Sequence, residues 1–189
     1  MDIYTRTGDD GTTGLLYGGR VRKDAAAPAA YGDTDEAQAA IGMARARAEP
    51  GGELDTVLIG IERDLWVLMA ELAVAPENRH KLTPQATLVT DEMVEALERL
   101  IDDFQARYEV PKEFVVPGQD PVSAALDFAR TVTRRAERSA VALELEGTVA
   151  VKYLNRLSDL MFVLARWAEG GWVAAKEVPF DRRGEESQT

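Results

Sequence analysis

Apolar residues recur every three or four positions along most of the chain, the spacing that places side chains on one face of an α-helix. The longest series advances in steps of four and three: Leu54, Leu58, Ile61, Leu65, Leu68 and Leu72. The next comprises Val94, Leu97, Ile101, Phe104 and Tyr108. The last comprises Leu154, Leu157, Met161 and Leu164, with a second apolar flank of Leu160, Val163 and Trp167. These series predict three long bundle helices, and the two apolar flanks predict that the last helix is central.

Start and stop signals predict two further helices. Asp120 can cap a helix whose first position is Pro121, because a proline there gives up no hydrogen bond. The apolar face expected for this helix comprises Phe128, Val132, Ala136 and Leu143. A shorter first helix is expected from about Asp33 to Ala48, before a Pro-Gly-Gly stop at residues 50–52. The predicted fold is therefore all-α, a bundle of five helices.

Three segments lack helical periodicity and are predicted to be loops: residues 1–32, 76–89 and 110–119. The first is rich in Gly and Thr, and the other two carry prolines. Residues 180–189 are polar and have no capping signal, so we expect a disordered tail. Since no repeat or linker divides the chain, residues 1–189 are expected to form a single domain.

Composition limits the possible partners. The 189 residues are 46% hydrophobic and 29% charged, which is ordinary for one globular domain. The net charge of -11 argues against nucleic acid or an anionic membrane as a general partner, because those surfaces attract basic proteins. Any phosphate site must therefore be local. The N-terminus lacks the apolar core of a signal peptide and no apolar run approaches about 18 residues, so the cytoplasm is the expected location.

Composition also limits the chemistry. Cysteine is absent, which excludes disulfides, thiolate zinc sites and a cysteine nucleophile. The single histidine, His80, lies in a polar loop and is interpreted as a solvent-exposed bystander. One histidine also excludes most histidine-based metal clusters.

Four arginines fall within the ten residues from Ala129 to Arg138, ARTVTRRAER. Arg130, Arg134 and Arg138 are spaced one helical turn apart and form a cationic stripe. Arginine is the side chain best suited to bidentate recognition of phosphate or carboxylate. The alternative is a solvated helix face paired with local acids.

Two other segments carry candidate chemistry. The segment from Thr5 to Gly14 combines glycines and threonines that could form an anion-binding nest, although it lacks the Gly-Lys-Ser/Thr ending of a Walker A loop. The alternatives are a tight surface turn or a carboxylate turn for a metal ion. On the last helix, Asn155 and Asp159 share a face, and polar groups on an apolar helix need partners. They could instead satisfy each other and the arginines of the preceding helix.

Six segments are recognisable in order along the chain: IYTRTGDDGTTGLLYGG, RVRKD, AYGDTDEAQAAIG, FVVPG, ARTVTRRAER and YLNRLSDLMFVLAR. From Ile3 to Trp167 the chain thereby resembles the PduO-type ATP:cob(I)alamin adenosyltransferases, a family of corrinoid adenosyltransferases. The resemblance implies a ferritin-like five-helix bundle that assembles as a homotrimer, with active sites between neighbouring subunits. It also implies transfer of the 5′-deoxyadenosyl group of ATP to the cobalt of cob(I)alamin, with release of triphosphate.

The resemblance further implies roles for individual residues. ATP-binding residues are expected in the N-terminal loop, residues 1–32, and on the last two helices: Thr5, Arg6, Thr7, Gly8, Thr13, Lys23, Arg134, Arg135, Glu137, Arg138 and Asn155. Arg130 and Asp35 match an intersubunit ion pair, and Phe114 matches an aromatic residue that crowds the lower face of cobalamin. Catalysis is expected to depend on these three residues and Arg134, with Mg²⁺ on the triphosphate and no metal site made by the protein alone. A flavoprotein reductase and a B12-dependent enzyme are expected partners.

The residue types agree with this chemistry, because cob(I)alamin is itself a strong nucleophile and requires none from the protein. Orientation and charge stabilisation remain, which arginines and a Gly/Thr nest can supply. The alternative function is a non-catalytic ATP- or cobalamin-binding homologue that acts as a carrier or sensor, and a purely structural bundle is a third.

Three positions depart from the family pattern. Gln119 stands where glycine is usual, so a backbone conformation that glycine favours could be lost there. Asp127 stands where histidine is common and could weaken the local positive field. Gln38 replaces a usual asparagine. Gln119 and Gln38 concern the corrinoid side or the interface, and all three changes leave the expected ATP-binding residues intact.

Overall fold

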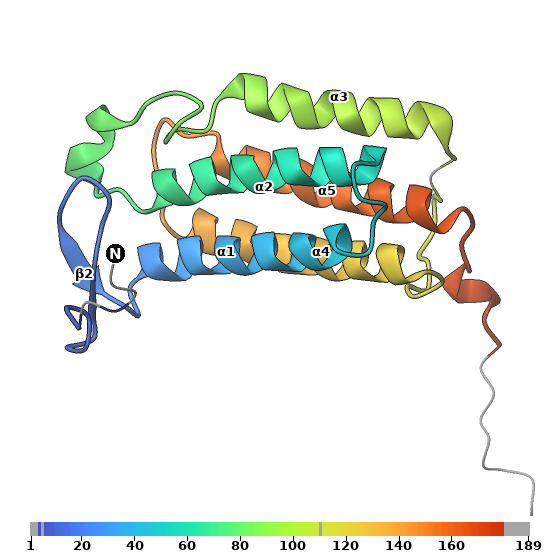
Figure 1. The fold of residues 1–189 in the computed structure, drawn as a ribbon, viewed down its shortest axis with the longest axis horizontal. Helices are drawn as coiled ribbons and strands as arrows, with labels where there is room; N and C mark the ends of the chain where they lie inside the picture. Colours follow the sequence, from blue (N-terminus) through green and yellow to red (C-terminus); the bar gives the residue numbers. More distant parts are fainter. Residues whose placement is uncertain (1–3, 5, 110, 180–189) are drawn as a thin grey trace, which may run out of the picture.

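The computed structural model describes residue 4, residues 6–109 and residues 111–179. Within them five long helices form a bundle (Figure 1): α1 (Ala26–Arg45), α2 (Glu53–Leu72), α3 (Asp91–Arg107), α4 (Pro121–Val141) and α5 (Ala150–Glu169). The smaller elements are β1 (Thr12–Gly14), β2 (Arg20–Arg22) and two 3₁₀ helices, η1 (Pro76–Lys81) and η2 (Ala175–Glu177). The predicted all-α, five-helix fold is confirmed. None of the helices in the described ranges is long and apolar enough to cross a membrane.

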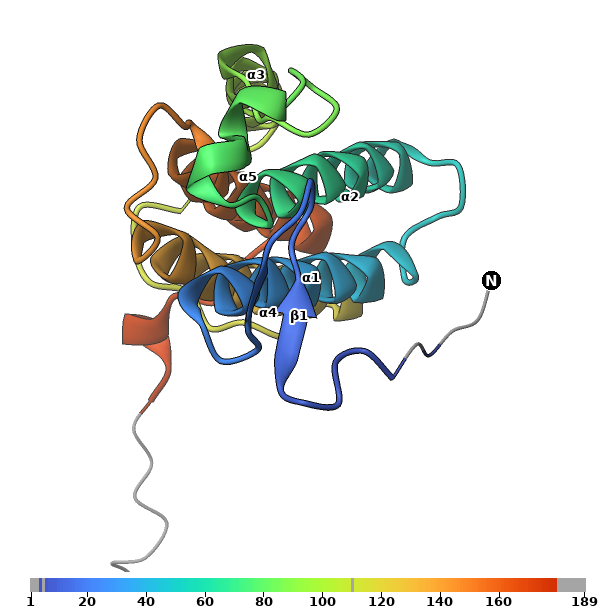
Figure 2. The same ribbon diagram turned by 90° about the vertical axis from the view of Figure 1, so that its left-hand side faces the viewer.

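The apolar faces predicted from periodicity form the core. The six seam residues of α2 are buried, and so are the four of α5 together with the flanking Leu160 and Val163. Helix α5 packs against α3 and α4, and α1 packs against α2 and α4. Viewed from the end of the bundle, α5 lies among α2, α3 and α4 (Figure 2). The last helix is therefore central, as its two apolar flanks predicted.

Helix α1 begins at Ala26, earlier than the predicted start near Asp33. Residues 25–30 read AAAPAA, and alanine is the strongest helix former. Pro28 lies within the first turn, where a missing N–H costs no intrahelical hydrogen bond. The prediction of a loop over residues 1–32 is therefore wrong from Ala26 onward. The loop predicted over residues 76–89 likewise contains the 3₁₀ helix η1.

Helix α4 has the predicted cap, and two of the four residues of its predicted apolar face, Val132 and Ala136, are buried. Asp120 Oδ1 accepts hydrogen bonds from the backbone N–H groups of Val122 and Ser123 at 2.7 and 3.1 Å. Phe128, predicted to be buried, is 49% exposed, and α4 ends before Leu143. The buried face of α4 carries many small residues, among them Ala125, Ala129, Ala136 and Ala140, together with the larger Leu126 and Val132. Phe128 lies outside this face.

The N-terminal segment forms a two-stranded antiparallel hairpin at the end of the bundle where α1 begins (Figure 1). Thr13 pairs with Val21, and the turn of the hairpin is fixed to the bundle by a hydrogen bond from Leu16 N to Ala73 O at 2.8 Å. Asp10 Oδ1 accepts from both the N–H and the hydroxyl of Thr12, which lowers the pKa of Asp10. The predicted loop is thus a hairpin with a tight turn leading into it. Thr5 and the tail expected to be disordered, residues 180–189, lie outside the described residues.

Candidate functional site

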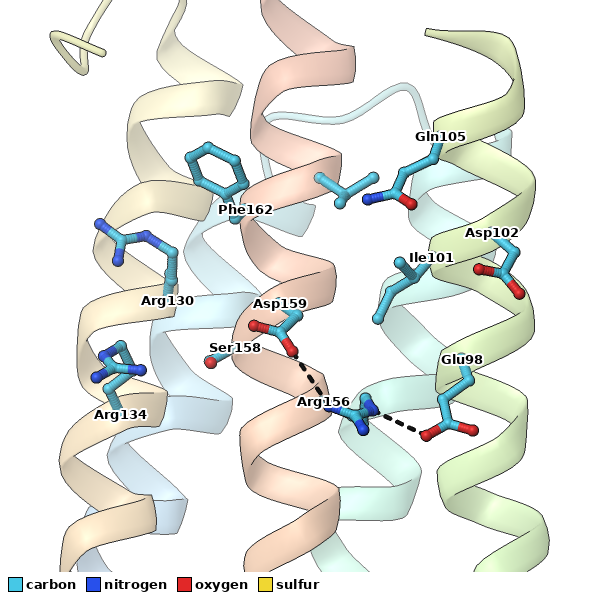
Figure 3. Close-up of a pocket in the computed structure, with 11 residues that line it drawn as sticks. Glu98, Ile101, Asp102, Gln105, Arg130, Arg134, Arg156, Ser158, Asp159 and Phe162 are labelled. Carbon is cyan, nitrogen blue, oxygen red and sulfur yellow. Dashed lines mark hydrogen bonds and ion pairs between the residues drawn. The ribbon is translucent and has the colours of Figure 1, made fainter. Parts of the chain in front are cut away.

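A cavity of about 700 Å³ opens between α3, α4 and α5. Figure 3 shows it lined by Arg130 and Arg134 from α4, by Arg156 and Asp159 from α5, and by Glu98 from α3. Two of the three arginines of the cationic stripe, Arg130 and Arg134, therefore line a cavity, whereas Arg138 does not. A neighbouring helix, α5, adds a further arginine, Arg156. The sequence did not single it out, because the stripe was recognised by its spacing within one helix and Arg156 lies on another.

The arginines of this cavity differ in how far nearby acids neutralise them. Arg156 Nε lies 2.8 Å from Glu98 Oε1, and Arg156 Nη1 lies 3.5 Å from Asp159 Oδ2. The hydrogen bond to Glu98 raises the pKa of Arg156. Arg134 is exposed and forms no ion pair with any of the residues that the structure describes. Its charge is available to an incoming anion.

A second cavity, of about 440 Å³, adjoins the first and shares Arg130 and Phe162 with it. The loop of residues 111–117 forms its other wall, and Phe114 in that loop is 90% exposed. A ring so exposed adds little to the stability of the fold, because the gain from a large apolar side chain comes from burying it. Phe114 is therefore a large apolar side chain in the wall of this cavity that the fold itself does not bury.

Arg130 stands between the two cavities and is held by a buried acid. Its Nε lies 3.5 Å from Asp127 Oδ1, and Asp127 Oδ2 accepts a hydrogen bond of 2.5 Å from the wholly buried Arg166. Arg166 also lies 2.7 Å from Glu169 Oε1, and this positive charge opposes the rise that burial causes in the pKa of Glu169. Asp127 therefore does not act on Arg130 alone, because its negative charge is shared with the buried Arg166 of the same chain.

The backbone after Phe114 depends on Gly118 and not on residue 119. Gly118 has a φ of +107°, in the region that favours glycine, whereas Gln119 is not in that region. Gln119 therefore does not adopt a glycine-favoured conformation in this chain, and the expectation that its substitution for glycine affects this loop stays a prediction. Gln38, the other departure on the corrinoid or interface side, is half-buried on α1.

Asn155 and Glu137, both expected to bind ATP, are joined across the α4–α5 interface. Asn155 Nδ2 donates to Glu137 Oε1 at 3.2 Å, and Asn155 Oδ1 accepts from Arg156 Nη1 at 3.4 Å. Asp159 pairs instead with Arg156. The alternative in which Asn155 and Asp159 satisfy each other and the arginines of α4 is therefore wrong.

The other two arginines of residues 129–138, Arg135 and Arg138, do not line this cavity. Arg135 Nε lies 3.4 Å from Asp33 Oδ1, and Arg135 also pairs with Glu36, which raises the pKa of Arg135. Arg138 is exposed and donates to the backbone O of Arg134 at 3.0 Å. The interpretation of local ion pairing thus fits Arg135, whereas Arg134 fits the interpretation of an anion site.

The N-terminal candidates gather around the base of the hairpin. A Cβ on Gly8 would lie 3.0 Å from Thr12 O and 3.2 Å from Lys23 Nζ, so the Lys23 side chain packs directly over Gly8. Arg20, which the sequence did not single out, donates to Thr7 O and to Thr12 Oγ1, each at 2.6 Å. Arg20 makes these contacts because β2 pairs with β1. Strands of three residues are too short to be recognised from a sequence pattern, so the contacts of Arg20 were not predicted.

The hairpin group and the cavity group lie in different places on one chain. The hairpin is attached to the loop after α2 at the end of the bundle, whereas Arg134 and Asn155 lie on α4 and α5 (Figure 2). Tyr17 and Gly18, in the hairpin turn, contact Thr87 and Asn78 of that loop.

His80, a possible metal site and Asp35 are the candidates that remain. His80 is exposed, and its Nδ1 lies 2.9 Å from Glu77 O. Across the described part of the chain, no three His, Asp or Glu side chains are grouped to hold a metal ion. Asp35 is exposed on α1.

Comparisons with known proteins agree with one another. A family described as cobalamin adenosyltransferase matches residues 3–168. The chain is 46% identical to a corrinoid adenosyltransferase of Mycobacterium tuberculosis over 171 residues, 88% of each chain, and 42% identical to one of Bacillus subtilis, covering 88% of this chain and 86% of that one. A variant of a PduO-type ATP:corrinoid adenosyltransferase from Lactobacillus reuteri, solved with cobalamin and ATP, superposes with a TM-score of 0.80 at 31% identity. That match covers 89% of this chain and 94% of the other.

Proposed function

The chain belongs to the cobalamin adenosyltransferase family, and from this membership we propose how its residues transfer the 5′-deoxyadenosyl group of ATP to the cobalt of cob(I)alamin. Its relatives are corrinoid adenosyltransferases, and one has been solved with both substrates. The observation that carries the proposal is the position of Arg134. This arginine is unpaired among the described residues and lies in a cavity that adjoins the one lined by Phe114.

The reaction is a substitution at the ribose 5′ carbon. The cobalt of the substrate cob(I)alamin supplies the electron pair of the new cobalt–carbon bond. The bond from the 5′ carbon to oxygen breaks, and triphosphate leaves with the electron pair of the broken bond. The protein supplies no nucleophile, so its contribution is orientation of the two substrates and stabilisation of the leaving charge. We propose that Arg134 stabilises the charge on the leaving triphosphate. A hydrogen bond to a charged group contributes about 1.5–3 kcal/mol, so one such arginine can make a sizeable contribution.

We place the adenine nucleotide against the hairpin of one subunit and against α4 and α5 of a neighbour in a homotrimer. Two observations support this arrangement. The hairpin group, with Lys23 over Gly8, and the group of Arg134 and Asn155 belong to different elements of the chain, so two subunits could each supply one group. Asp35 is exposed on α1 and has no ion pair among the described residues, so it is free to meet Arg130 of a neighbour. Thr5, Arg6, Thr7, Thr13, Arg135, Glu137 and Arg138 remain proposed ATP-binding residues on the strength of the resemblance.

We assign the cavity beside Phe114 to the corrin ring. Its wall combines apolar surface from Phe114 and Phe162 with the charged Asp127 and Arg130, which suits a large ring with polar side groups. Mg²⁺ is expected to accompany the triphosphate, and phosphate oxygens would be its main ligands.

We further propose that the enzyme works in the cytoplasm, receives Co(I) from a flavoprotein reductase and supplies a B12-dependent enzyme. These partners follow from the chemistry. Cob(I)alamin needs a reductant upstream, and the adenosylated product serves as a cofactor elsewhere.

Anaerobic spectroscopy tests the activity. Purified protein is mixed with chemically reduced cob(I)alamin and Mg²⁺-ATP, and we expect the cob(I)alamin absorption band to decay as adenosylcobalamin and triphosphate appear in equal amounts. Tight ATP binding without any adenosylcobalamin would instead identify a carrier or sensor.

A further inference from the structure

Glu71, near the C-terminal end of α2, is a buried carboxylate outside both cavities. Its side chain is wholly buried, and it accepts three hydrogen bonds from separate parts of the chain. Oε1 accepts from Arg79 Nη2 at 2.8 Å and from Thr148 Oγ1 at 2.5 Å, and Oε2 accepts from the backbone N–H of Val89 at 2.9 Å. A buried charge is costly unless it is paired and fully hydrogen-bonded, and here both conditions are met.

The bonds of Glu71 organise the segment of residues 73–89, which we call the platform. Arg79 lies in η1 near the middle of the platform, and Val89 lies at its far end. Arg79 is itself largely buried, and among the described residues its Nη1 has no hydrogen-bond partner. Arg79 therefore depends on Glu71 for its counter-charge. Without that carboxylate the platform would lose the contacts that fix its middle and its end.

The platform in turn carries the hairpin. Leu16 N donates to Ala73 O at 2.8 Å, and Leu16 forms an isolated parallel bridge with Val74. Farther along, Asn78 Nδ2 lies 3.4 Å from Gly18 O, and the Tyr17 hydroxyl lies 3.4 Å from Thr87 Oγ1. The strands are only three residues long, and an isolated two-stranded hairpin is marginally stable in water. Its orientation must therefore come from the surface on which it rests.

From these contacts we infer that Glu71 is a positioning residue for nucleotide binding, acting through the platform to fix the hairpin that carries Gly8, Thr13 and Lys23. The inference rests on the proposed function, in which those residues hold ATP. Glu71 touches neither substrate. Thr148, its third partner, accepts from Ala150 N at 3.0 Å at the start of α5, so the same carboxylate also fixes the end of the helix that carries Asn155.

Glu71→Gln is the direct test, because it keeps the size of the side chain and removes its charge. The amide NH₂ would face donors on Arg79 or Val89, so at least one bond of the cluster must break. We expect hydrogen exchange of the amides in residues 6–23 to become about tenfold faster. We also expect the KM for ATP to rise about tenfold, which corresponds to 1.4 kcal/mol, while kcat and the KM for cob(I)alamin stay within about twofold.

Asp55→Asn is the matched control. Asp55 anchors a loop at the opposite end of α2 with the same kinds of bond, from Arg45 Nε at 2.7 Å and from Gly51 N at 2.8 Å. We expect it to lower the melting temperature without changing exchange in residues 6–23 or the KM for ATP. Equal effects of the two variants would overturn the inference, because they would show a general loss of stability.

Two further outcomes are informative. Unchanged exchange in residues 6–23 of the folded Glu71→Gln protein would overturn the inference whatever the activity. If wild-type protein forms no adenosylcobalamin, the proposed function fails, but the exchange comparison still decides whether Glu71 positions the hairpin.

A second variant serves if Glu71→Gln does not fold. Arg79→Gln leaves the carboxylate with its other two bonds, and we expect a smaller change in the same direction. No change in exchange or in the KM for ATP would again count against the inference.

Discussion

Asn155 Nδ2 donates to Glu137 Oε1 at 3.2 Å, which joins α5 to α4 beside the arginine cavity. The other end of the same amide accepts from Arg156 Nη1 at 3.4 Å. With both ends held, the orientation of Asn155 is fixed before a nucleotide arrives. Through this hydrogen bond Glu137 holds the Asn155 amide in place, in addition to its proposed role in ATP binding.

This arrangement predicts different effects for two substitutions of Glu137. Glu137→Gln keeps an acceptor for Asn155, so we expect the KM for ATP to change by less than about twofold. Glu137→Ala removes the acceptor, and loss of a hydrogen bond of about 1 kcal/mol should raise the KM for ATP about fivefold. Steady-state kinetics at saturating cob(I)alamin measure both. If the two variants behave alike, the charge of Glu137 and not its hydrogen bond is what matters.

Arg134→Ala should disable turnover while leaving the fold intact. The side chain is exposed and unpaired among the described residues, so its loss should leave the melting temperature within about 1 °C of wild type. Removing one preorganised donor from a developing negative charge lowers kcat by about 10²–10³-fold in well-studied sites. Arg99→Ala, which removes an exposed arginine paired with Glu95 on α3, is the control and should retain full activity. Wild-type kinetics in Arg134→Ala would remove this residue from the mechanism.

The helices were predictable because burial repeats with the period of the helix. The seam from Leu54 to Leu72 is buried as predicted, and Asp120 caps α4 because its requirements are local: a short acceptor side chain followed by proline. Phe128 shows where this reasoning fails. Its spacing fits the apolar face of α4, but the face buried in the bundle is centred on Leu126, Ala129, Val132 and Ala136 and leaves the ring of Phe128 outside.

The site was predictable in its residue types but not in its pairings. Arg134 and Arg135 are adjacent in sequence, and periodicity does not say which of them meets an acid. The structure places Asp33 of α1 beside Arg135 and leaves Arg134 in the cavity. Glu71 gave no sequence signal, because its partners Arg79, Val89 and Thr148 come together only when α2, the platform and the start of α5 are assembled.

The proposed intersubunit pair of Arg130 and Asp35 can be tested with a neighbouring acid as control. Asp35→Ala should weaken the trimer about tenfold or more, because close charge pairs at interfaces couple by about 1.5 kcal/mol or more. Arg130→Ala should do the same, and the double variant should be no weaker than either single one. Asp33 is the control because it bonds within its own chain, to Arg135 and to the Ser139 hydroxyl.

Sedimentation velocity over a dilution series measures the trimer dissociation constant for each variant. Asp33→Ala should lower the melting temperature and leave that constant near its wild-type value. Additive effects of Arg130→Ala and Asp35→Ala would show that the two side chains do not pair.

Asp64 should give the stability of this protein a measurable pH dependence. The carboxylate is four-fifths buried beside Tyr153, whose hydroxyl donates to Asp64 Oδ2 at 3.3 Å, and burial raises the pKa of Asp64 against the smaller opposing effect of Arg63. A carboxyl whose pKa is higher in the folded chain binds protons more tightly there than when unfolded. The free energy of unfolding therefore falls as pH rises from the unfolded pKa near 3.8 through the folded pKa, and it stays lower above that interval.

Asp64→Asn removes this titration while keeping an acceptor for the Tyr153 hydroxyl. The ion pair lost with Arg63 is solvent-exposed on the arginine side and contributes at most about 1 kcal/mol. We therefore expect the melting temperature of the variant, relative to wild type, to rise between pH 3.5 and pH 7. In this interval residue 64 becomes charged in the wild-type protein, whereas the asparagine of the variant does not ionise. Differential scanning calorimetry at several pH values measures the difference. A gap that is constant across this range, or that narrows as pH rises, would show that the buried Asp64 carboxylate carries no net cost in the fold.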